Sequence, residues 1–584
     1  MTPTRPTADS LLTDHLRHWA GLRPQQRAFS HVDFPAPGTK GVHRSLGWRT
    51  LDQRARAVAE RFMNVAGPGD RAALVLPQGL DYIAAFLGCL YAGVVAVPLS
   101  APGLPGHESR LAAVLADCEP ACLLSDFTTA RAVRAFADEH AIPAAPVVLV
   151  DQLTAPTAEL TEFGPRPEPD DIAYLQYTSG STRTPTGVMI SHANVVANAR
   201  QAIDAFVADP DPAAATTVGW LPLFHDMGLV LSVAAPVVGG FGSVLMNPAA
   251  FLENPARWLR LLGSYEGTIS AAPNFAYDYC VSRIDPELID ELNLERVNVL
   301  INGSEPVRPG TVRRFRTACE PAGLAPEALC PAYGLAEATV FVTADPYTDV
   351  LSTLPCDAGA LAAGRIEPGD PADPDAAVLV SCGTPVGQEL RITGVGGEVL
   401  PEGQVGEIQL RGPNIGRGYW KRAALSAEMF AVDPGPGDEG DGQGGWLRTG
   451  DLGAVHDGRL FVTGRLKDVI IVDGRNHYPQ DIEETVQSVA GLIRRDRLAA
   501  FGVSRPDGTG EKLVVVAEYR RDADPTPEDA WQAERTVRAA VSARHGLRLG
   551  TLMLVPPGSV PRTSSGKVAR AASRARYLDG GFGR

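Results

Sequence analysis

Lysine is the residue that this chain most clearly lacks. Lys and Arg total 53 of 584 residues, but only five are lysines, which leaves 48 arginines. A coding bias toward arginine accounts for most of this imbalance. Because Lys carries a compact ammonium and Arg a planar guanidinium, chemistry that needs a point charge has few candidates. They are Lys40, Lys421, Lys467, Lys512 and Lys567.

Cysteine and positive charge are also scarce. Eight cysteines without a CxxC pair indicate neither a disulfide framework nor a zinc site. Cys118 and Cys122 lie four apart, as on one helical face, but have no partners at zinc-like spacing. The net charge of −15 lacks the long-range attraction to phosphate backbones that nucleic-acid binders show, so we expect no nucleic acid as partner. No signal pattern opens the chain, which favours the cytoplasm.

The longest uncharged stretch imitates a membrane span. From Tyr82 to Leu99, 18 residues carry no charge, which is near the lower limit for spanning. Gly88 and Gly93 interrupt the stretch. We therefore predict a buried helix that ends near Gly93, then a buried strand Val94–Val97, and no membrane insertion.

Most of the chain predicts an α/β protein. Short apolar runs at Ala73–Leu76, Val147–Val150, Ala173–Tyr177 and Val297–Ile301 alternate with helical patterns. Continuous apolar strands of this kind are typical of parallel sheets that helices cover on both faces.

The pattern changes after about residue 381. Gln388–Ile392, Gly406–Arg411 and Gly453–Gly464 are short strands with turn signals, and Asp457-Gly458 predicts a hairpin within the last. These strands indicate a small antiparallel sheet or barrel.

From about residue 467 the chain has the pattern of a separate α+β unit. Leu513–Val516 is a strand, and Thr526 caps a helix that starts at Pro527 and stops at Gly546.

Two segments resist regular structure. Asp433–Gly445 is an acidic, glycine-rich loop whose literal G-x-G-x-x-G match is accidental, because no strand precedes it and no helix follows. Residues 344–380 are rich in Pro, Gly and Asp, and are too long for a simple connector.

The sharpest chemical motif is Tyr177–Gly187 (YTSGSTRTPTG), which follows a predicted strand and precedes a helical pattern near Ser191. A turn rich in glycine and hydroxyls can wrap around phosphates through its N–H and O–H donors. No Walker string GxxxxGK[ST] occurs in the chain, which argues against a generic ATPase or kinase.

Further motifs follow this loop in a fixed order. They are Trp220–Gly228 (WLPLFHDMG), Asn302–Pro306 (NGSEP), Tyr333–Thr339 (YGLAEAT), Trp446–Asp451 (WLRTGD), Gly464–Asp468 (GRLKD), Gly474–Asp481 (GRNHYPQD) and Pro561–Lys567 (PRTSSGK). The ordered set resembles the adenylate-forming superfamily of acyl-CoA synthetases, luciferases and peptide-synthetase adenylation domains. The finer match is to fatty acyl-AMP ligases, through Thr178–Val188, Ala272–Ala276 (APNFA), Asn302–Arg308 and Gly464–Asp481.

With the element order, this resemblance implies a two-domain α/β protein. The N-terminal adenylation domain would span 1–466, with α/β subdomains at about 1–170 and 171–380 and a small antiparallel β-barrel at 381–466. A smaller, mobile α+β lid domain would span 467–584. The segment at 344–380 stands where this branch carries an insertion that is linked to weak use of free CoA.

The resemblance also implies a nucleotide site. The phosphate loop would hold the β- and γ-phosphates of ATP, with Arg183 beside it in the pattern of the acyl-AMP ligases. Glu337 would contact Mg²⁺, since hard cations bind oxygen ligands. Asp451 would accept hydrogen bonds from the ribose with support from Arg465. The remaining residues implied for ATP are Thr178, Ser179, Gly180, Ser181 and Thr182 in the loop, and Gly303, Ser304, Glu305, Tyr333 and Gly334 around adenine.

Three residues would serve the reaction itself. His225 would lie near the substrate carboxylate and the α-phosphate, and Lys567 would bring a mobile point charge to the same two groups. Lys467 would lie at the hinge about which the C-terminal domain turns.

The resemblance implies an ATP-dependent ligase that makes acyl-AMP and pyrophosphate and then transfers the acyl group to a phosphopantetheine thiol. The thiol would belong to an acyl carrier protein or to a carrier domain of a polyketide or peptide synthetase. An acyl-CoA ligase and a non-catalytic nucleotide- or acyl-binding protein are the alternatives.

Small and apolar residues at Gly228–Phe241 and Ala271–Ala276 allow an acyl tunnel for a fatty acid. Leu231 and Ser232 would shorten or bend it, so a short, polar or aryl acid stays open as well.

Overall fold

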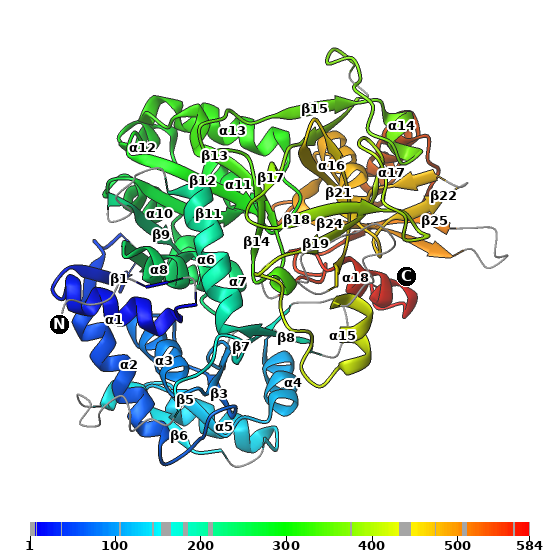
Figure 1. Ribbon diagram of the computed structural model, residues 1–584. Helices are drawn as coiled ribbons and strands as arrows, with labels where there is room; N and C mark the ends of the chain where they lie inside the picture. Colours follow the sequence, from blue (N-terminus) through cyan, green and yellow to red (C-terminus); the bar gives the residue numbers. More distant parts are fainter. Residues whose placement is uncertain are drawn as a thin grey trace.

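The computed structural model describes most of the chain (Figure 1). The described residues are 6–7, 9–36, 38–103, 107–142, 145–153, 165–178, 185–207, 214–373, 376–430, 445–472, 475–504, 511–563 and 567–582. Five predicted phosphate-loop residues lie outside these ranges, namely Ser179, Gly180, Ser181, Thr182 and Arg183. Most of the acidic loop Asp433–Gly445 lies outside them too.

The largest sheet has nine strands and a parallel centre. Its order is β17-β14-β13-β12-β11-β9-β10-β1-β2, and neighbours from β13 to β1 run parallel. Antiparallel strands close the two edges. The strands are β1 (Arg27–Asp33), β2 (Val42–Gly47), β9 (Thr216–Gly219), β10 (Gly242–Met246), β11 (Thr268–Pro273), β12 (Val297–Gly303), β13 (Leu329–Gly334), β14 (Phe341–Ala344) and β17 (Thr384–Pro385).

A second sheet has six strands in the order β6-β5-β3-β4-β7-β8, all parallel except β8 at the edge. The predicted apolar strands fall here and in the first sheet within one or two residues. The strands are β3 (Arg71–Leu74), β4 (Val95–Pro98), β5 (Cys122–Ser125), β6 (Val147–Leu149), β7 (Ile172–Tyr177) and β8 (Gly187–Ser191).

Helices cover these sheets and bury most of their central strands, such as β4, β5 and β11. Those before residue 260 are α1 (Leu12–Leu22), α2 (Trp48–Phe62), α3 (Leu80–Tyr91), α4 (Glu108–Cys118), α5 (Ala130–Glu139), α6 (His192–Phe206), α7 (Asp226–Leu229), α8 (Ala235–Gly239), α9 (Pro248–Glu253) and α10 (Ala256–Leu262). They are followed by α11 (Asn274–Arg283), α12 (Pro286–Asp290) and α13 (Pro309–Cys319).

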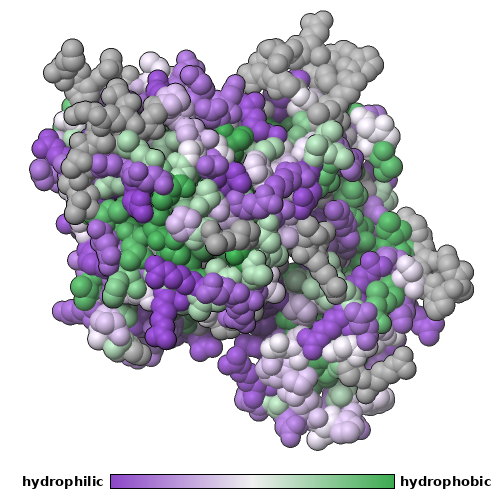
Figure 2. Space-filling view, turned by 90° about the horizontal axis from the view of Figure 1, so that it is seen from below, coloured by the Kyte–Doolittle hydropathy of each residue, from purple (hydrophilic) through white to green (hydrophobic). Residues whose placement is uncertain are grey.

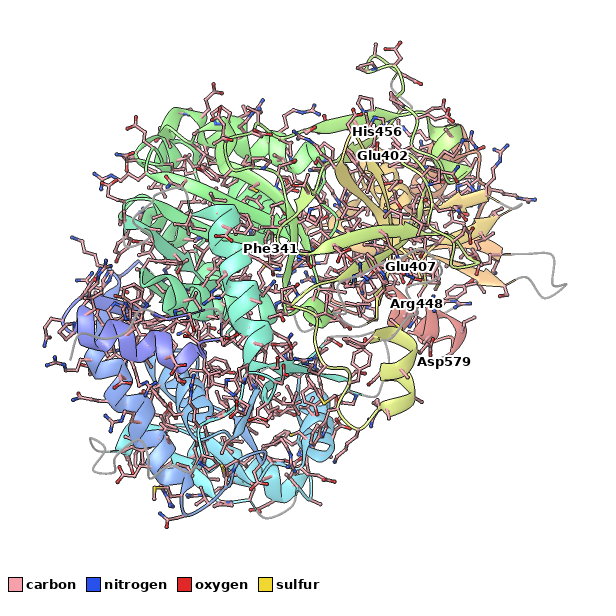
Figure 3. All side chains as sticks on the ribbon, viewed as in Figure 1. Phe341, Glu402, Glu407, Arg448, His456 and Asp579 are labelled. Carbon is pink, nitrogen blue, oxygen red and sulfur yellow. The ribbon has the colours of Figure 1, made fainter. Side chains whose placement is uncertain are left out.

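Helix α6 joins the two sheets. It contacts β8 of the smaller sheet and β14 of the larger one. The side chain of Asn198 on α6 donates to the carbonyl of Phe341 at 2.8 Å and accepts its backbone N–H at 3.0 Å, so α6 is hydrogen-bonded to β14 near the centre of the molecule (Figure 3).

A smaller antiparallel sheet follows at the predicted place. Its order is β18-β19-β20-β21, which is open between β18 and β21 among the described residues, where we predicted an antiparallel sheet or barrel. Asp457 and Gly458 have φ of +50° and +73°, which confirms the hairpin turn. Glu407 and Arg448 pair across β19 and β20 at 2.8 Å (Figure 3). The elements are β18 (Glu389–Thr393), β19 (Gly406–Arg411), α15 (Ala423–Phe430), β20 (Leu447–His456) and β21 (Arg459–Arg465).

The segment at 344–380 folds into a hairpin with a short helix, β15 (Thr353–Cys356), α14 (Ala358–Ala362) and β16 (Ala377–Val380). Cys356 and Leu361 share one buried cluster with Tyr478 from the C-terminal part of the chain. The segment therefore packs between the antiparallel sheet and that part.

The C-terminal part is an α+β unit with its own apolar core. A three-stranded sheet, β24-β25-β26, lies beside the two-stranded β22-β23. Thr526 caps α17 and Gly546 ends it, as predicted. The elements are β22 (Ile470–Val472), β23 (Arg475–His477), α16 (Pro479–Val489), β24 (Ile493–Ser504), β25 (Glu511–Tyr519), α17 (Pro527–His545), β26 (Leu549–Val555) and α18 (Arg570–Leu578). The predicted α/β class with a smaller C-terminal unit is confirmed.

The structure agrees with the prediction for the uncharged stretch but not with the suggestion that Cys118 and Cys122 share a helical face. Seen from below, polar residues cover most of the molecule, with an apolar area between them (Figure 2). Within the described ranges, no helix is long and apolar enough to cross a bilayer. The uncharged stretch is α3 followed by β4. Cys118 ends α4 and Cys122 lies on β5, so the two do not share a helical face.

Candidate active site

The carboxyl ends of β12 and β13 form the floor of the candidate site. These strands are parallel neighbours, so the residues that follow them meet at one edge of the sheet. Gly303 ends β12, and a Cβ there would lie 2.9 Å from the carbonyl oxygen of Ala332. Gly334 ends β13, and a Cβ there would lie 1.7 Å from the carbonyl oxygen of Val340, so only glycine fits. Both predicted glycines thus allow two loops to approach closely.

The structure brings Tyr333, Asp451 and Arg465 together. The phenol of Tyr333 donates to Asp451 Oδ2 at 2.9 Å in a buried contact. Arg465 lies opposite Asp451 in the β20–β21 pairing, with its Nε 3.1 Å from Asp451 Oδ1. Burial raises the pKa of Asp451, against the opposing effects of Arg465 and Tyr333. The result is a carboxylate held from two sides by donors.

Glu337 lies in a single 3₁₀ turn, Ala336–Ala338, directly after β13. The phenol of Tyr419 donates to Glu337 Oε1 at 2.9 Å. Burial raises the pKa of Glu337, and this hydrogen bond opposes the rise. Sequence reasoning missed Tyr419 as a site residue; its signal was the aromatic pair Tyr419-Trp420 after Gly418.

Ser304 and Glu305 form a strained corner after β12. Ser304 has a φ of +68°, in the left-handed region that non-glycine residues seldom adopt. Glu305 Oε1 accepts the backbone N–H of Phe275 at 2.6 Å, which ties the corner to the start of α11. Burial raises the pKa of Glu305, opposed by that hydrogen bond and then by Lys567 and Arg308.

His225 is the residue before α7. Its Nδ1 lies 2.5 Å from Oδ1 of Asp226, the first residue of that helix, in an ion-pair geometry. Burial acts to raise the pKa of Asp226, but His225, the backbone N–H of Met227 and Lys567 outweigh it and lower that pKa. Asp226 is a second residue that sequence reasoning passed over, although it stands inside the motif.

Lys567 reaches this site from the C-terminal unit. It lies in the loop between β26 and α18, part-buried, with its backbone held to Thr563 by two hydrogen bonds of 2.8 and 3.2 Å. Burial lowers the pKa of Lys567, opposed by the carboxylates of Glu305 and Asp226. The ammonium therefore lies within electrostatic range of acidic groups that precede it by more than 250 residues.

The described base of the phosphate loop closes a strand pair. The N–H of Thr178 donates to the carbonyl of Thr186 at 3.2 Å, at the end of the antiparallel β7–β8 pair. Arg110 on α4 donates to the carbonyls of Tyr177 and Thr178 at 3.2 and 2.8 Å. Arg110 had no signal in the sequence, because it stands 68 residues before the loop.

Lys467 stands two residues after Arg465, in the turn that follows β21. Its side chain is exposed, in a turn where the N–H of Asp468 donates to the carbonyl of Arg465 at 3.0 Å. It directly follows β21 and precedes the C-terminal unit, which suits a connecting turn.

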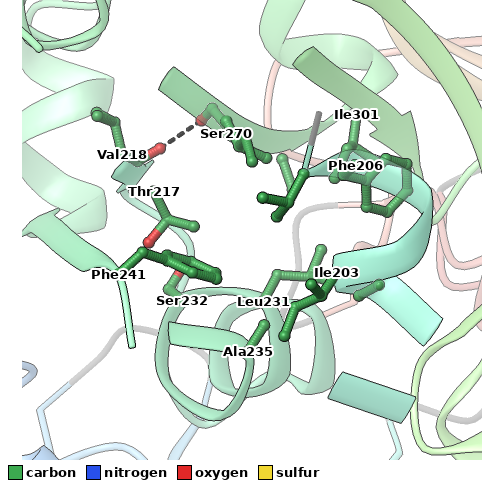
Figure 4. A pocket seen from close by; sticks show the side chains of 14 residues that line it. Ile203, Phe206, Thr217, Val218, Leu231, Ser232, Ala235, Phe241, Ser270 and Ile301 are labelled. Carbon is green, nitrogen blue, oxygen red and sulfur yellow. Dashed lines mark hydrogen bonds between the residues drawn. The ribbon is translucent and has the colours of Figure 1, made fainter. Parts of the chain in front are cut away.

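A small apolar cavity lies in the N-terminal part of the chain (Figure 4). Its volume is about 20 Å³, enough for about one water. A π-helical turn, Val230–Ala234, continues α7 along one wall. The lining residues are Ala202, Ile203, Phe206, Val207, Thr217, Val218, Leu231, Ser232, Ala235, Phe241, Ile269, Ser270, Ala271 and Ile301. The lining thus shares β11, β12 and the turn after α7 with the elements that carry the site residues.

Two family models match the chain. The model of the AMP-binding enzymes matches residues 16–420, and the AMP domain of Disco-interacting protein 2-like proteins matches residues 467–582.

Individual proteins match over nearly the whole length. The chain is 41% identical to the long-chain-fatty-acid–AMP ligase FadD32 of Mycolicibacterium smegmatis, over 98% of this chain and 95% of that protein. It is 40% identical to the 4-hydroxyphenylalkanoate adenylyltransferase of Mycobacterium marinum, over 99% and 93%. A solved structure from a study of fatty acyl-adenylate ligases of E. coli and L. pneumophila superposes with a TM-score of 0.85 at 31% identity, covering 99% of this chain and 98% of that chain.

Proposed function

The chain belongs to the fatty acyl-AMP ligase branch of the AMP-binding enzymes, and from this premise we propose how its own residues perform the reaction. The enzyme joins a carboxylic acid to the α-phosphate of ATP, which gives acyl-AMP and pyrophosphate. It then passes the acyl group to the phosphopantetheine thiol of an acyl carrier protein or carrier domain.

The observation that carries the assignment is the proximity of Lys567, on the C-terminal unit, to acidic residues of the N-terminal part. Adenylate formation brings two anions together, the carboxylate and the α-phosphate, and needs positive charge where they meet. Lys567 brings a point charge within electrostatic range of Glu305 and Asp226. His225, next to Asp226, orients the carboxylate or the phosphate through its ring N–H.

The nucleotide would lie across the ends of β12, β13 and β20. Asp451, held by Tyr333 and Arg465, accepts the ribose hydroxyls. Gly303, Ser304, Glu305 and Gly334 would border the adenine. Thr178 begins the loop that takes the β- and γ-phosphates, together with Ser179–Arg183.

Mg²⁺ fits Glu337. Mg²⁺ in nucleotide enzymes commonly binds one or two carboxylates, with substrate phosphates and waters as its other ligands. Glu337 is a part-buried carboxylate whose Oε1 is oriented by Tyr419. No group of three or more His, Cys, Asp or Glu among the described residues could hold a metal without such phosphates. Bound there, the ion would neutralise phosphate charge.

The second step requires the C-terminal unit to turn. We propose the division at 1–466 and 467–584, with subdomains at about 1–170, 171–380 and 381–466, and Lys467 at the hinge. The rotation would withdraw Lys567 and open the site to the thiol. The hairpin and helix α14 at 344–380 pack against Tyr478 of the C-terminal unit, where they would limit the approach of free CoA.

The acid would place its chain in the apolar cavity. Its walls include β11, which ends at Pro273, β12, which ends at Gly303, and the π-helical turn that continues α7, so a carboxylate at the site would extend its chain inward. At about 20 Å³ the cavity accepts a chain only when side chains such as Leu231 move. An apolar acid fits this lining best.

The first test is ATP–pyrophosphate exchange with a panel of saturated acids from short to long and of hydroxyphenylalkanoic acids. We expect exchange with at least one acid, and the mass of the released adenylate identifies it. Nucleotide binding without exchange for any acid would instead support a non-catalytic binding protein.

A second test separates the acceptors. The adenylate formed in place is offered free CoA or a carrier protein bearing phosphopantetheine. Transfer to the carrier alone supports the proposal, whereas efficient turnover with free CoA would make the enzyme an acyl-CoA ligase.

A further inference from the structure

Arg308 stands beside the site without belonging to it. It directly precedes α13 and lies three residues after Glu305. Its backbone N–H donates to Oδ1 of Asn274 at 3.1 Å, and the next residue, Phe275, donates its N–H to Glu305. The backbone at Arg308 is therefore tied to the same corner that faces Lys567.

The Arg308 side chain reaches into the C-terminal unit. Its Nη1 donates to Oδ1 of Asp496 on β24, and lies 3.6 Å from Oε2 of Glu484 on α16. The side chains of Arg308 and Asp496 are 24% and 31% exposed, so the pair is partly shielded from solvent. A charge-assisted hydrogen bond in such surroundings is stronger than an exposed ion pair.

Asp496 is presented by an irregular piece of strand. The pairing of β24 with β25 shifts register between Ile493 and Leu498. Within this bulge Asp496 has a φ of +54°, and its N–H donates to Oε1 of Gln487 at 3.1 Å. Bulges re-aim side chains, and a left-handed backbone at a non-glycine residue persists only where its surroundings enforce it. Here the outcome is a carboxylate directed at Arg308.

The other acidic groups near Arg308 do not replace Asp496. Glu483 is bound by Arg570 at 2.6 and 2.7 Å. Glu305 lies on the same side of the interface as Arg308, so it cannot hold the two units together. Asp481 on α16 is also influenced by the charge of Arg308, but the ion-pair contacts across the interface are with Asp496 and, more weakly, Glu484.

We propose that Arg308 is a positioning residue for adenylate formation, which through Asp496 holds the C-terminal unit where Lys567 meets Glu305 and Asp226. The inference rests on the proposed function for its catalytic consequence. The ion pair has to break when the unit turns for acyl transfer. Losing it therefore slows the first step and leaves the second step unimpeded.

The first experiment tests the hold on the unit without using activity. Trypsin cleavage after Arg465 or Lys467 is followed by intact mass for the wild type, Arg308→Ala, Asp496→Ala and the double variant. We expect about tenfold faster cleavage at this turn in all three variants, because a C-terminal unit without the Arg308–Asp496 ion pair exposes the turn to trypsin more often. Arg314→Ala is the matched control, because Arg314 on the same helix pairs with Asp278 at 2.7 Å within the N-terminal part.

The second experiment separates the two steps. Adenylation is measured by pyrophosphate exchange, and transfer by the reaction of isolated acyl adenylate with pantetheine. In Arg308→Ala we expect the kcat of adenylation to fall about tenfold with little change in the KM of ATP, and transfer to be unchanged. Arg308→Lys should recover most of the loss. The double variant should lose no more than the worse single variant, because contacting partners are not additive.

The inference is overturned if Arg308→Ala matches Arg314→Ala in cleavage and adenylation, or if the losses of the two single variants multiply in the double variant. If even the wild type shows no exchange with any acid while the difference in cleavage between the variants and the control persists, the proposed function fails. In that case the Arg308–Asp496 ion pair is still shown to hold the C-terminal unit.

Discussion

The two sides of the active site are built differently. On the N-terminal side, buried hydrogen bonds between segments distant in the chain hold the carboxylates, as Tyr333 holds Asp451 and Tyr419 holds Glu337. On the C-terminal side, Lys567 is held through its backbone to Thr563, four residues away. In the proposed function, the nucleotide end is therefore preorganised, while the charge needed for the reaction would be delivered by a separate unit.

This difference matches what each step needs. A binding surface for ribose and adenine serves both half-reactions and gains from rigidity. A cation beside the carboxylate and the α-phosphate serves only the first, so a removable loop suits it. Arg308 and Asp496 connect the two sides through their ion pair, by which we propose that they hold the loop in place without touching the reacting groups.

Among the substitutions that test this difference between the two sides, replacing Lys567 should have the largest effect on the rate of adenylation. We expect Lys567→Ala to lower the rate of adenylation by about 10²–10³-fold, the usual loss for one preorganised group that stabilises developing charge. Lys567→Arg should recover little, because a planar guanidinium does not replace a point charge in a narrow loop. Pyrophosphate exchange measures both variants.

Lys512 provides the control for that substitution. It lies on β25 of the same unit, with its Nζ 3.5 Å from the phenol of Tyr577, away from the site. Lys512→Ala should exchange at the wild-type rate. If Lys567→Ala and Lys512→Ala exchange equally, Lys567 is not the delivered charge.

Replacing Asp451 tests the preorganised side. We expect Asp451→Asn to raise the KM of ATP by about tenfold or more, because a charged acceptor for the ribose is lost. Tyr333→Phe should give a smaller rise of the same kind, since it removes only the 2.9 Å hydrogen bond that orients the carboxylate. Kinetics at varied ATP measure both. A fall in kcat with unchanged KM would show that Asp451 acts on the reaction rather than on nucleotide binding.

Local patterns in the sequence predicted the elements that local chemistry determines. The helix capped by Thr526 and the Asp457-Gly458 hairpin follow from capping and turn preferences within a few residues. The α/β class follows from apolar strands that alternate with helices. These signals need no knowledge of the tertiary structure.

Contacts between residues that are distant in the chain could not be predicted from the sequence. Tyr419 and Glu337 lie 82 residues apart, and Arg308 and Asp496 lie 188 apart. No periodicity connects such pairs, and the φ of +54° at Asp496 arises from a bulge that its own residue type does not indicate. Motif order grouped Tyr333, Asp451 and Arg465 only through the resemblance to a family.

The apolar cavity extends the comparison into the core. Leu231 on the π-helical turn lines the cavity and narrows it. We expect Leu231→Ala to shift kcat/KM toward longer acids by about tenfold for acids that differ by a few methylenes. Val230→Ala, on the same turn but outside the cavity lining, should leave the preference for acids unchanged while it lowers stability. The acid panel measures the shift. If the order of preference among the acids is unchanged in Leu231→Ala, the acyl chain of the substrate does not bind in this cavity.

The smallest expected effect concerns pH and the C-terminal unit. Burial, with Glu483 beside it, raises the pKa of Asp481 to about 7, and Arg308 and Arg570 oppose the rise. The folded protein therefore keeps a proton that the unfolded chain releases near its ordinary, lower pKa. Between about pH 4 and 7 the unfolding free energy must then fall as pH rises. We expect the Tm of the wild type, relative to Asp481→Asn, to fall by about 3 °C from pH 5 to pH 8.

Asp579, an exposed residue after α18, is the control for this effect (Figure 3). Asp579→Asn should keep the wild-type dependence of Tm on pH, whereas Asp481→Asn should flatten it. Arg308 opposes the rise in the pKa of Asp481. Arg308→Ala should therefore make the dependence of Tm on pH steeper than in the wild type. Parallel Tm curves for all four proteins would mean that Asp481 is ionised throughout this range, and that the acidic face of the C-terminal unit is solvated rather than buried against Arg308.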